Sequence, residues 1–211
     1  MGFPIYDFRT DIRNVLVTPQ IRARFLKLEP GTVAKPHTHD LGHEVFLILQ
    51  GRAIFEIDGE RAELGPGQMC VALVNQSHGI TVISKEPVIM YLSVTPHIQP
   101  THTLWTADGK RLPHRFISNE NYDVRPPSSA SDAEAVDKQI KAAKEFGEAA
   151  RRAVERQVTL GAKLKKALAT RDEATARATR DQMWDSLCEV FNKAPELADA
   201  WNDLAPRGGT E

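Results

Sequence analysis

Residues 21–94 alternate between short apolar runs and residues that favour turns. Runs of about four to eight residues rich in Val, Ile, Leu and Phe are typical of β-strands, and many such runs at close intervals indicate a sandwich or barrel. The Asp58-Gly59 pair lies between two runs and predicts a two-residue hairpin turn of type I′. The runs predicted as strands are Ile21–Leu28, Val45–Leu49, Ala53–Ile57, Met69–Val74, Ile80–Ile83 and Val88–Val94.

The hydrophobic period changes from two to about three and a half beyond Tyr122. The Pro- and Ser-rich stretch that follows is predicted to be a linker. We therefore expect an α+β protein with a β domain, a linker, a helical appendage and a tail. Their predicted ranges are 1–122, 123–131, 132–205 and 206–211.

The predicted helices follow capping signals. A Ser-x-x-Glu pattern opens the stretch 131–169, and the apolar stripe of that stretch predicts one long amphipathic helix. A Thr-x-x-Glu pattern opens the stretch 170–193, which is predicted to form a second helix. Pro195 predicts the start of a short third helix, because proline is favoured in the first helical turn.

A helical hairpin with an Ala-rich stripe is marginally stable alone. We therefore expect its stripe to pack against the β domain or another subunit, with a homodimer as the expected assembly. A DNA-reading hairpin is the alternative, because basic residues gather at Arg151-Arg152 and at 163–166. Residues 126–211 hold almost as many basic as acidic residues, so we assign the basic side chains to a solvated face and expect no nucleic-acid partner.

The composition of the whole chain limits its class. It has 211 residues, 41% of them hydrophobic, and a formal net charge of −1, which indicates a soluble protein without a broad surface for polyanions. Cys70 and Cys188 have no paired spacing, and we expect reduced thiols in a cytoplasmic protein. The sequence shows no signal-peptide pattern and no run long enough to span a bilayer, so no membrane partner is expected.

The segment from Gly31 to Gly51 carries three side chains suited to metal binding. His37 and His39 are two residues apart, and on a strand both imidazoles emerge on the same face. Glu44 follows a predicted turn and opens an apolar run, where a carboxylate is costly unless it is paired or bound to a cation. Two imidazoles and one carboxylate suit Fe, Mn, Ni, Zn or Cu better than Ca or Mg, which prefer oxygen ligands alone.

His78 is the best candidate for a fourth ligand. With Gly67 it forms a partial second motif, in which Leu73 and Asn75 replace the usual Pro and Gly. Asn is one of the few residues besides Gly that readily adopts positive φ, so the turn is expected to survive the change. Val82 stands where an Asn usually closes this motif.

Together these two motifs resemble those of the cupin superfamily, in particular single-domain metal-binding members, here with a C-terminal helical extension. The resemblance covers residues 12–94 and nothing downstream. It implies an antiparallel double-stranded β-helix, or jelly-roll barrel, that holds one divalent transition metal through His37, His39, Glu44 and His78.

The cupin fold does not decide the function, because the same barrel hosts many kinds of enzyme and binding protein. We expect a metal-dependent oxidoreductase of dioxygenase type that acts on a small organic substrate, because three imidazoles and one carboxylate leave coordination positions open. Phe46 stands where certain cupin lyases carry a tyrosine, which argues against a lyase. The alternative is a non-catalytic, metal-dependent cupin that binds or senses a small ligand and assembles through its helices.

Two further residues are candidates for catalysis. Tyr91 could offer a phenol to a substrate, although packing with its hydroxyl at the rim is the commoner role. His97 and His102 lie in a loop that could line or cover the barrel mouth. Their spacing matches no ligand pair, however, and favours a plain surface loop. His43 is expected to point away from the metal, because neighbouring side chains alternate along a strand.

Three residues of the predicted strands receive structural interpretations. Arg22 and Arg24 alternate on one strand, and one of them could anchor an anion inside the barrel, but solvent exposure is the expected state. Cys70 has no evident base nearby and is expected to be a small buried hydrophobe rather than a nucleophile.

Overall fold

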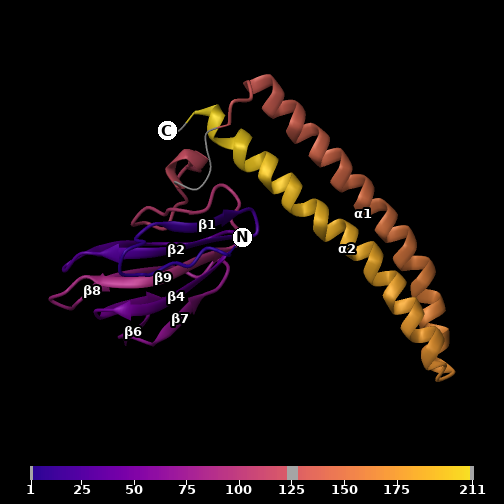
Figure 1. Cartoon of the computed structure of the whole chain (residues 1–211), viewed down its shortest axis with the longest axis horizontal. Helices are drawn as coiled ribbons and strands as arrows, with labels where there is room; N and C mark the ends of the chain where they lie inside the picture. The colour runs from indigo at the N-terminus through magenta and orange to yellow at the C-terminus, as the bar shows by residue number, and fades with distance from the viewer. Residues whose placement is uncertain (1, 123–127, 210–211) are drawn as a thin grey trace. The chain divides into compact units, whose positions relative to one another are not determined.

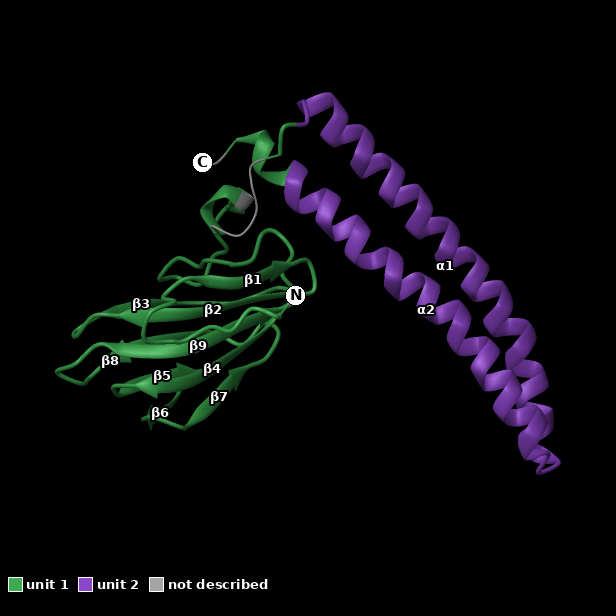
Figure 2. Ribbon diagram, in the orientation of Figure 1, with its two compact units in different colours: residues 1–129, 205–211 green, residues 130–204 purple. Residues whose placement is uncertain are grey.

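The computed structural model describes residues 2–122 and 128–209 of the chain (Figure 1). The chain divides into two compact units, shown in different colours in Figure 2. Residues 1–129 and 205–211 form the first, which we call the β unit, and residues 130–204 form the second, the helical hairpin. Each unit is described by itself below.

The β unit consists of two antiparallel sheets. One sheet has the strand order β1-β2-β9-β4-β7, and the other has the order β3-β8-β5-β6. This architecture confirms the predicted α+β class with a jelly-roll arrangement of strands. The strands are β1 (Asn14–Thr18), β2 (Ile21–Leu28), β3 (Val33–His37), β4 (His43–Gln50), β5 (Ala53–Ile57), β6 (Glu60–Leu64), β7 (Met69–Ala72), β8 (His78–Val82) and β9 (Val88–Thr95), and a 3₁₀ turn, η1, covers Asn119–Tyr122.

The strand pattern missed β1, β3 and β6, which are all edge strands of their sheets. An edge strand packs on one side only, so its sequence carries fewer apolar residues. β6, for example, reads Glu-Arg-Ala-Glu-Leu and buries only Leu64. The predicted runs correspond to the remaining strands, which lie more centrally or alternate more clearly.

The core lies between the inner faces of the two sheets. Phe46 of β4 and Phe55 of β5 meet there with ring centroids 5.1 Å apart, and both are almost fully buried. Antiparallel pairing aligns Phe46 with Leu92 of β9 and Cys70 of β7, so these side chains share the inner face. Strand alternation then places the next residue in each strand on the outer face.

Two turns have the backbone conformation that the sequence predicts, and a third, at Gly51, requires glycine. Asp58 and Gly59 both have positive φ, 49° and 84°, as a type I′ hairpin between β5 and β6 requires. Asn75 has φ 63° in the turn before β8, which confirms that it adopts the positive φ expected where Gly is usual. Gly51 has φ 76°, and a Cβ there would lie 2.7 Å from the Pro87 carbonyl oxygen, so both conformation and space require glycine.

The hairpin contains α1 (Asp132–Ala169) and α2 (Glu173–Leu204), and a 3₁₀ turn, η2, covers Ala205–Gly208. The predicted capping box at the start of α1 is confirmed, because the Ser131 hydroxyl accepts from the Glu134 N–H and Glu134 accepts from the Ser131 N–H. No helix in the described part of the chain is both long and apolar enough to cross a membrane.

Two predictions about α2 are wrong. The cap of α2 is Asp172, whose carboxylate accepts from the Thr175 N–H, whereas Thr170 forms the C-cap of α1. Pro195 lies inside α2 and starts no separate helix. Contacts with α1 flank this proline, including ion pairs of Lys193 and Asp199, so packing on both sides offsets the lost backbone hydrogen bond.

Small residues form the seam between α1 and α2. The buried residues of α1 are Ala135, Ala149, Ala153 and Ala167. Their size lets the helices approach closely. The larger apolar residues of the predicted stripe lie beside this seam and remain open, as Val154 does with 63% of its surface exposed. The predicted stripe was therefore offset from the surface that α2 covers.

Candidate metal centre

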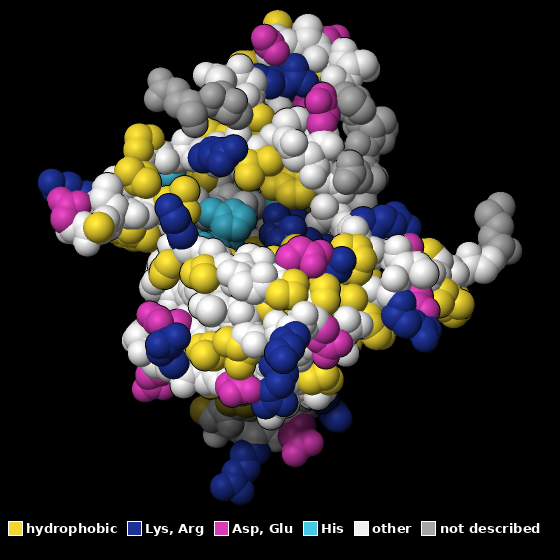
Figure 3. All heavy atoms as spheres, turned by 90° about the vertical axis from the view of Figure 1, so that its left-hand side faces the viewer, with side chains coloured by type: hydrophobic (Ala, Val, Ile, Leu, Met, Phe, Trp, Pro, Cys, Tyr) yellow, Lys and Arg dark blue, Asp and Glu magenta, His cyan; other side chains and the backbone are white. Residues whose placement is uncertain are grey.

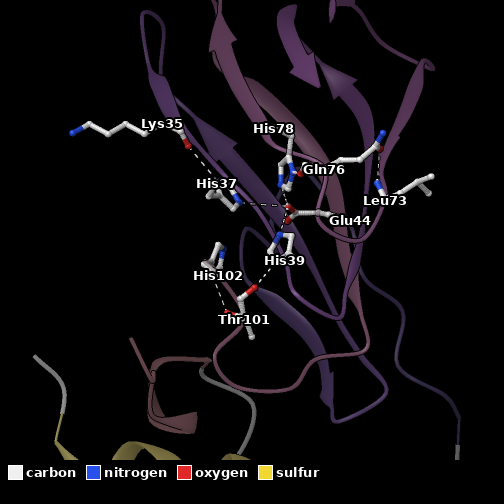
Figure 4. A network of polar contacts seen from close by, with 9 residues as sticks. All are labelled: Lys35, His37, His39, Glu44, Leu73, Gln76, His78, Thr101 and His102. Carbon is white, nitrogen blue, oxygen red and sulfur yellow. Dashed lines mark hydrogen bonds and ion pairs between the residues drawn. The ribbon is translucent and has the colours of Figure 1, made fainter. Parts of the chain in front are cut away.

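The four predicted ligands come from both sheets and one turn, and the structure brings them together (Figure 4). His37 ends β3 and pairs with His78 at the start of β8, in the four-stranded sheet. Glu44 lies on β4 in the opposite sheet, in one inward row with Val94. His39 belongs to the turn between β3 and β4, and its carbonyl accepts from the Asn75 N–H at 2.9 Å.

The imidazoles converge on one carboxylate. One ligand atom from each of the four residues can be chosen so that all lie within 4.8 Å of one another. The distances from Glu44 Oε2 to the Nε2 atoms of His78, His39 and His37 are 2.8, 2.9 and 3.8 Å. This compact group of nitrogen and oxygen donors is compatible with a transition-metal site.

Backbone carbonyls fix the orientation of all three imidazoles. The Nδ1 atoms of His37, His39 and His78 face the carbonyl oxygens of Lys35, Thr101 and Gln76. Since a carbonyl oxygen can only accept, each Nδ1 carries the hydrogen and donates it. In the neutral imidazole, each Nε2 atom is thus left as a lone-pair donor that faces the centre of the group. Backbone carbonyls orient metal-binding histidines in the same way.

This arrangement is suited to a cation at its centre. A neutral imidazole presents its Nε2 lone pair to a carboxylate oxygen that also only accepts, so nothing joins them unless a proton or a metal ion lies between. His37 Nε2 is buried and has no hydrogen-bond partner among the described residues. The residues therefore fit a divalent ion that takes nitrogen and carboxylate ligands.

The electrostatics of the group keep Glu44 ionised. Burial by itself raises the pKa of Glu44, but the three surrounding imidazoles outweigh this effect and hold the pKa well below its ordinary value. Burial likewise lowers the pKa of His78, but the hydrogen bonds to Glu44 and to the Gln76 backbone raise it overall. Glu44 is thus ionised inside the barrel.

Solvent reaches the group from the side of His37. The His37 side chain is 18% exposed, whereas those of His39 and His78 are 2% and 1% exposed. The space-filling view shows histidine side chains in a hollow of the surface, with basic side chains beside them (Figure 3). Among the four residues, His37 is therefore the one most open to solvent.

His102 is a fourth histidine beside this group, and the sequence pattern did not assign it there. Its ring centroid lies 4.8 Å from that of His37 and 4.9 Å from that of His39. Burial, followed by the like charges of these two histidines, lowers the pKa of His102 to about 3, so its imidazole is neutral. Its only sequence signal was its place in the loop directly after β9.

The interpretation of that loop as a plain surface loop is wrong. The Thr101 carbonyl accepts from His39 Nδ1, and Thr38 and Thr103 form a β-bridge, so the loop is tied to the turn that holds the ligands. His97 is 1% exposed and packs edge-on against the Tyr122 ring at 4.9 Å. His97 thus lies within the loop packing and outside the group of four ligands.

The remaining candidates lie away from the group. His43 is exposed and its Nδ1 accepts from the Val74 N–H, so it points outward as predicted. Tyr91 lies on the outer face of β9, where its ring centroid is 6.3 Å from that of Phe25. Partial burial raises the pKa of the Cys70 thiol to about 11, which keeps it protonated and agrees with its assignment as a packing residue.

The expected solvent exposure of the two β2 arginines is wrong for Arg22, which is 4% exposed. Arg22 pairs with Val94, which in turn pairs with Glu44, so all three side chains share the inner face. Arg24 lies two residues on, on that same face, and is partly buried. In the sequence, alternation along the strand already places Arg22 and Arg24 on the same face as the inward Leu26 and Leu28.

Comparison with known proteins identifies the β unit. Residues 24–95 match the family model of the cupin domain. No curated protein matches the chain. One similar solved structure is an uncharacterized conserved protein with a double-stranded β-helix domain from Klebsiella pneumoniae subsp. pneumoniae, with 23% identity, a TM-score of 0.42, and coverage of 45% of this chain and 91% of that one.

Two other solved structures are also similar over the barrel. KdgF from Halomonas sp. has 28% identity and a TM-score of 0.38, and the match covers 40% of this chain and 78% of that one. Salicylate 1,2-dioxygenase from Pseudoaminobacter salicylatoxidans has 21% identity and a TM-score of 0.34, and the match covers 36% of this chain but only 20% of that one.

Proposed function

Residues 24–95 of this chain form a cupin domain, and on that premise we propose that the protein is a metal-dependent oxidoreductase of dioxygenase type that acts on a small organic substrate. One divalent transition metal would be held by His37, His39, Glu44 and His78. A single observation carries the proposal: three imidazoles, each oriented by a backbone carbonyl, direct their Nε2 atoms to one buried carboxylate oxygen.

The residues around such a site have different roles. Three neutral nitrogen donors and one anionic oxygen suit Fe, Mn, Ni, Zn or Cu, and four protein ligands leave coordination positions for substrate and dioxygen. A bound ion of this kind supplies Lewis acidity and, if it is redox-active, electrons for oxygen chemistry. Apolar residues of the inner face, such as Phe46 and Leu92, exclude water from one side of the group.

The metal content of the protein tests this proposal. We expect elemental analysis of the full-length protein, purified without added metal, to find close to one transition-metal ion per chain. With the native metal restored, the protein should consume oxygen in the presence of its substrate, which a screen of small organic compounds can find. Metal without oxygen uptake on any compound would favour the alternative, a cupin that binds or senses a small ligand. A protein that takes up no metal would contradict both.

We also propose that the protein is a homodimer that assembles through its hairpins. Large apolar side chains remain exposed on α1, among them Ile140, Val154 and Val158, while the seam with α2 uses small residues. A two-fold arrangement covers such a stripe with the same stripe of a second copy, and therefore needs no other protein.

Replacing Val158, which is 71% exposed, with Glu should shift the full-length protein from dimer to monomer, because the new charge would be buried at the interface. The neighbouring exposed Thr159 provides the matched control, and Thr159→Glu should leave the mass unchanged. Light scattering measures both masses. A wild-type monomer, or a Val158→Glu dimer as tight as wild type, would contradict the proposed interface.

A further inference from the structure

Two guanidinium groups share the interior of the barrel with the metal centre. Arg22 and Arg24 lie two residues apart on β2, so both side chains emerge on one face. Arg22, Val94 and Glu44 form one inward row across three strands. Arg24 belongs to the next row, with Leu92 and Phe46. The arginines thus stand beside the ligands, across β9 from Glu44.

Among the described residues, no acidic side chain forms a salt bridge with Arg22 or Arg24. The Nε atoms of Arg22 and Arg24 are both buried and lack a hydrogen-bond partner among the described residues. Other arginines of the β unit do pair, each with an Asp or Glu oxygen within 3.5 Å; these are Arg9, Arg13, Arg52, Arg61 and Arg111. A buried charge without a partner is costly, so a fold that keeps two of them together must offset that cost by some other interaction.

The structure also holds Arg22 in place. Its guanidinium carbon lies 5.4 Å from the centre of the Tyr122 ring, a cation–π contact. Tyr122 is itself fixed, because Gln99 Nε2 donates to its hydroxyl at 3.0 Å and the His97 ring packs against it. Contact with a ring face leaves the N–H groups at the edge of the guanidinium free to donate.

The charges near the pair leave it positive. Burial and the like charge of Arg22 lower the pKa of Arg24 to about 10, which still leaves it protonated at neutral pH. Glu44 is the nearby acid that opposes this shift, but its carboxylate is already surrounded by three imidazoles. One carboxylate therefore faces two guanidiniums together with the metal that the ligands would hold.

We propose that Arg22 and Arg24 form a carboxylate-binding subsite beside the metal centre, so that the substrate is a small organic carboxylate. The inference rests on the proposed function in taking this interior as the substrate pocket. Guanidinium N–H groups match a planar carboxylate in bidentate geometry. The rows around the pair are lined by Val94, Leu92 and Phe46, which suit the apolar remainder of an organic acid.

Calorimetric titration of the full-length, metal-restored protein tests the subsite. We expect benzoate and acetate to bind, and their amides, which have the same shape without the charge, to bind at least about tenfold more weakly. Arg22→Gln and Arg24→Gln should each weaken benzoate binding by about 10- to 100-fold, as expected for the loss of a charge-assisted hydrogen bond. Arg61→Gln, which changes an exposed arginine paired with Glu56, is the control and should not weaken it.

Metal content, measured on the same samples, separates this inference from the proposed function. Arginine-dependent benzoate binding without bound metal would reject the metal-dependent enzyme and keep the subsite. Three results with metal bound would overturn the subsite alone. These are equal affinities for benzoate and benzamide, no binding of either benzoate or acetate, and benzoate binding that neither arginine variant weakens. Inorganic phosphate that binds as tightly as benzoate would overturn the preference for carboxylates. Circular dichroism checks folding, and if Arg22→Gln does not fold, Arg24→Gln decides.

Discussion

Replacing Glu44 with Gln is expected to remove the metal from the purified protein while the β unit stays folded. The amide keeps the volume of the side chain, so the packing around it is preserved. It cannot supply the negative charge that holds a divalent ion among three neutral imidazoles. Loss of a group that only hydrogen-bonds to a metal ligand costs about 10- to 100-fold in metal affinity. Loss of a ligand itself should therefore weaken binding by more than about 100-fold and abolish oxygen uptake.

The neighbouring residue provides the matched control for that experiment. His43 is exposed and points to the outer side of β4, where it accepts from the Val74 N–H. His43→Gln should therefore leave both metal stoichiometry and oxygen uptake unchanged. Elemental analysis of the two variants, with circular dichroism to verify folding, gives the answer. Metal lost from His43→Gln but kept by Glu44→Gln would mean that the inward face of β4 has been assigned wrongly.

The four residues of the candidate site could be selected from the sequence because local rules largely determine where they point. His37 and His39 are close in sequence, and Glu44 opens an apolar strand where an unpaired carboxylate is unfavourable. His78 followed from the turn before it, which Asn75 allows through its positive φ. The backbone carbonyls that orient the imidazoles could not be predicted, because the Thr101 carbonyl reaches His39 only through contacts between distant segments.

Residues with long-range contacts were the ones that the sequence placed poorly. His102 approaches His37 because its loop pairs with the turn after β3, a contact that no local pattern records. Arg22 was a different case, since alternation along β2 already placed it on the inner face. The general preference of arginine for solvent outweighed that pattern in the sequence analysis, and the exception falls beside the candidate site, where such conflicts are expected.

Phe46 belongs to the barrel core and also lies beside His78 of the candidate metal centre. It is 1% exposed, and its ring centroid lies 5.1 Å from that of Phe55 and 5.8 Å from that of His78. Phe46→Ala is therefore expected to lower the free energy of unfolding of the β unit by about 3 to 5 kcal/mol, because it removes a buried ring and leaves a cavity between the two sheets. The same cavity would loosen His78 and so weaken metal binding as well.

Urea unfolding of the metal-free protein measures the stability term alone, since a bound ion would add its own contribution to the folded state. Trp105 is the tryptophan of the β unit, so a background in which Trp184 and Trp201 are replaced by Phe reports on this unit by fluorescence. Leu73, which is 52% exposed, provides the control, and Leu73→Ala should cost less than about 1 kcal/mol. Equal losses in the free energy of unfolding for Phe46→Ala and Leu73→Ala would show that the ring does not support the core between the sheets. That result would also contradict the expected link between packing and metal affinity.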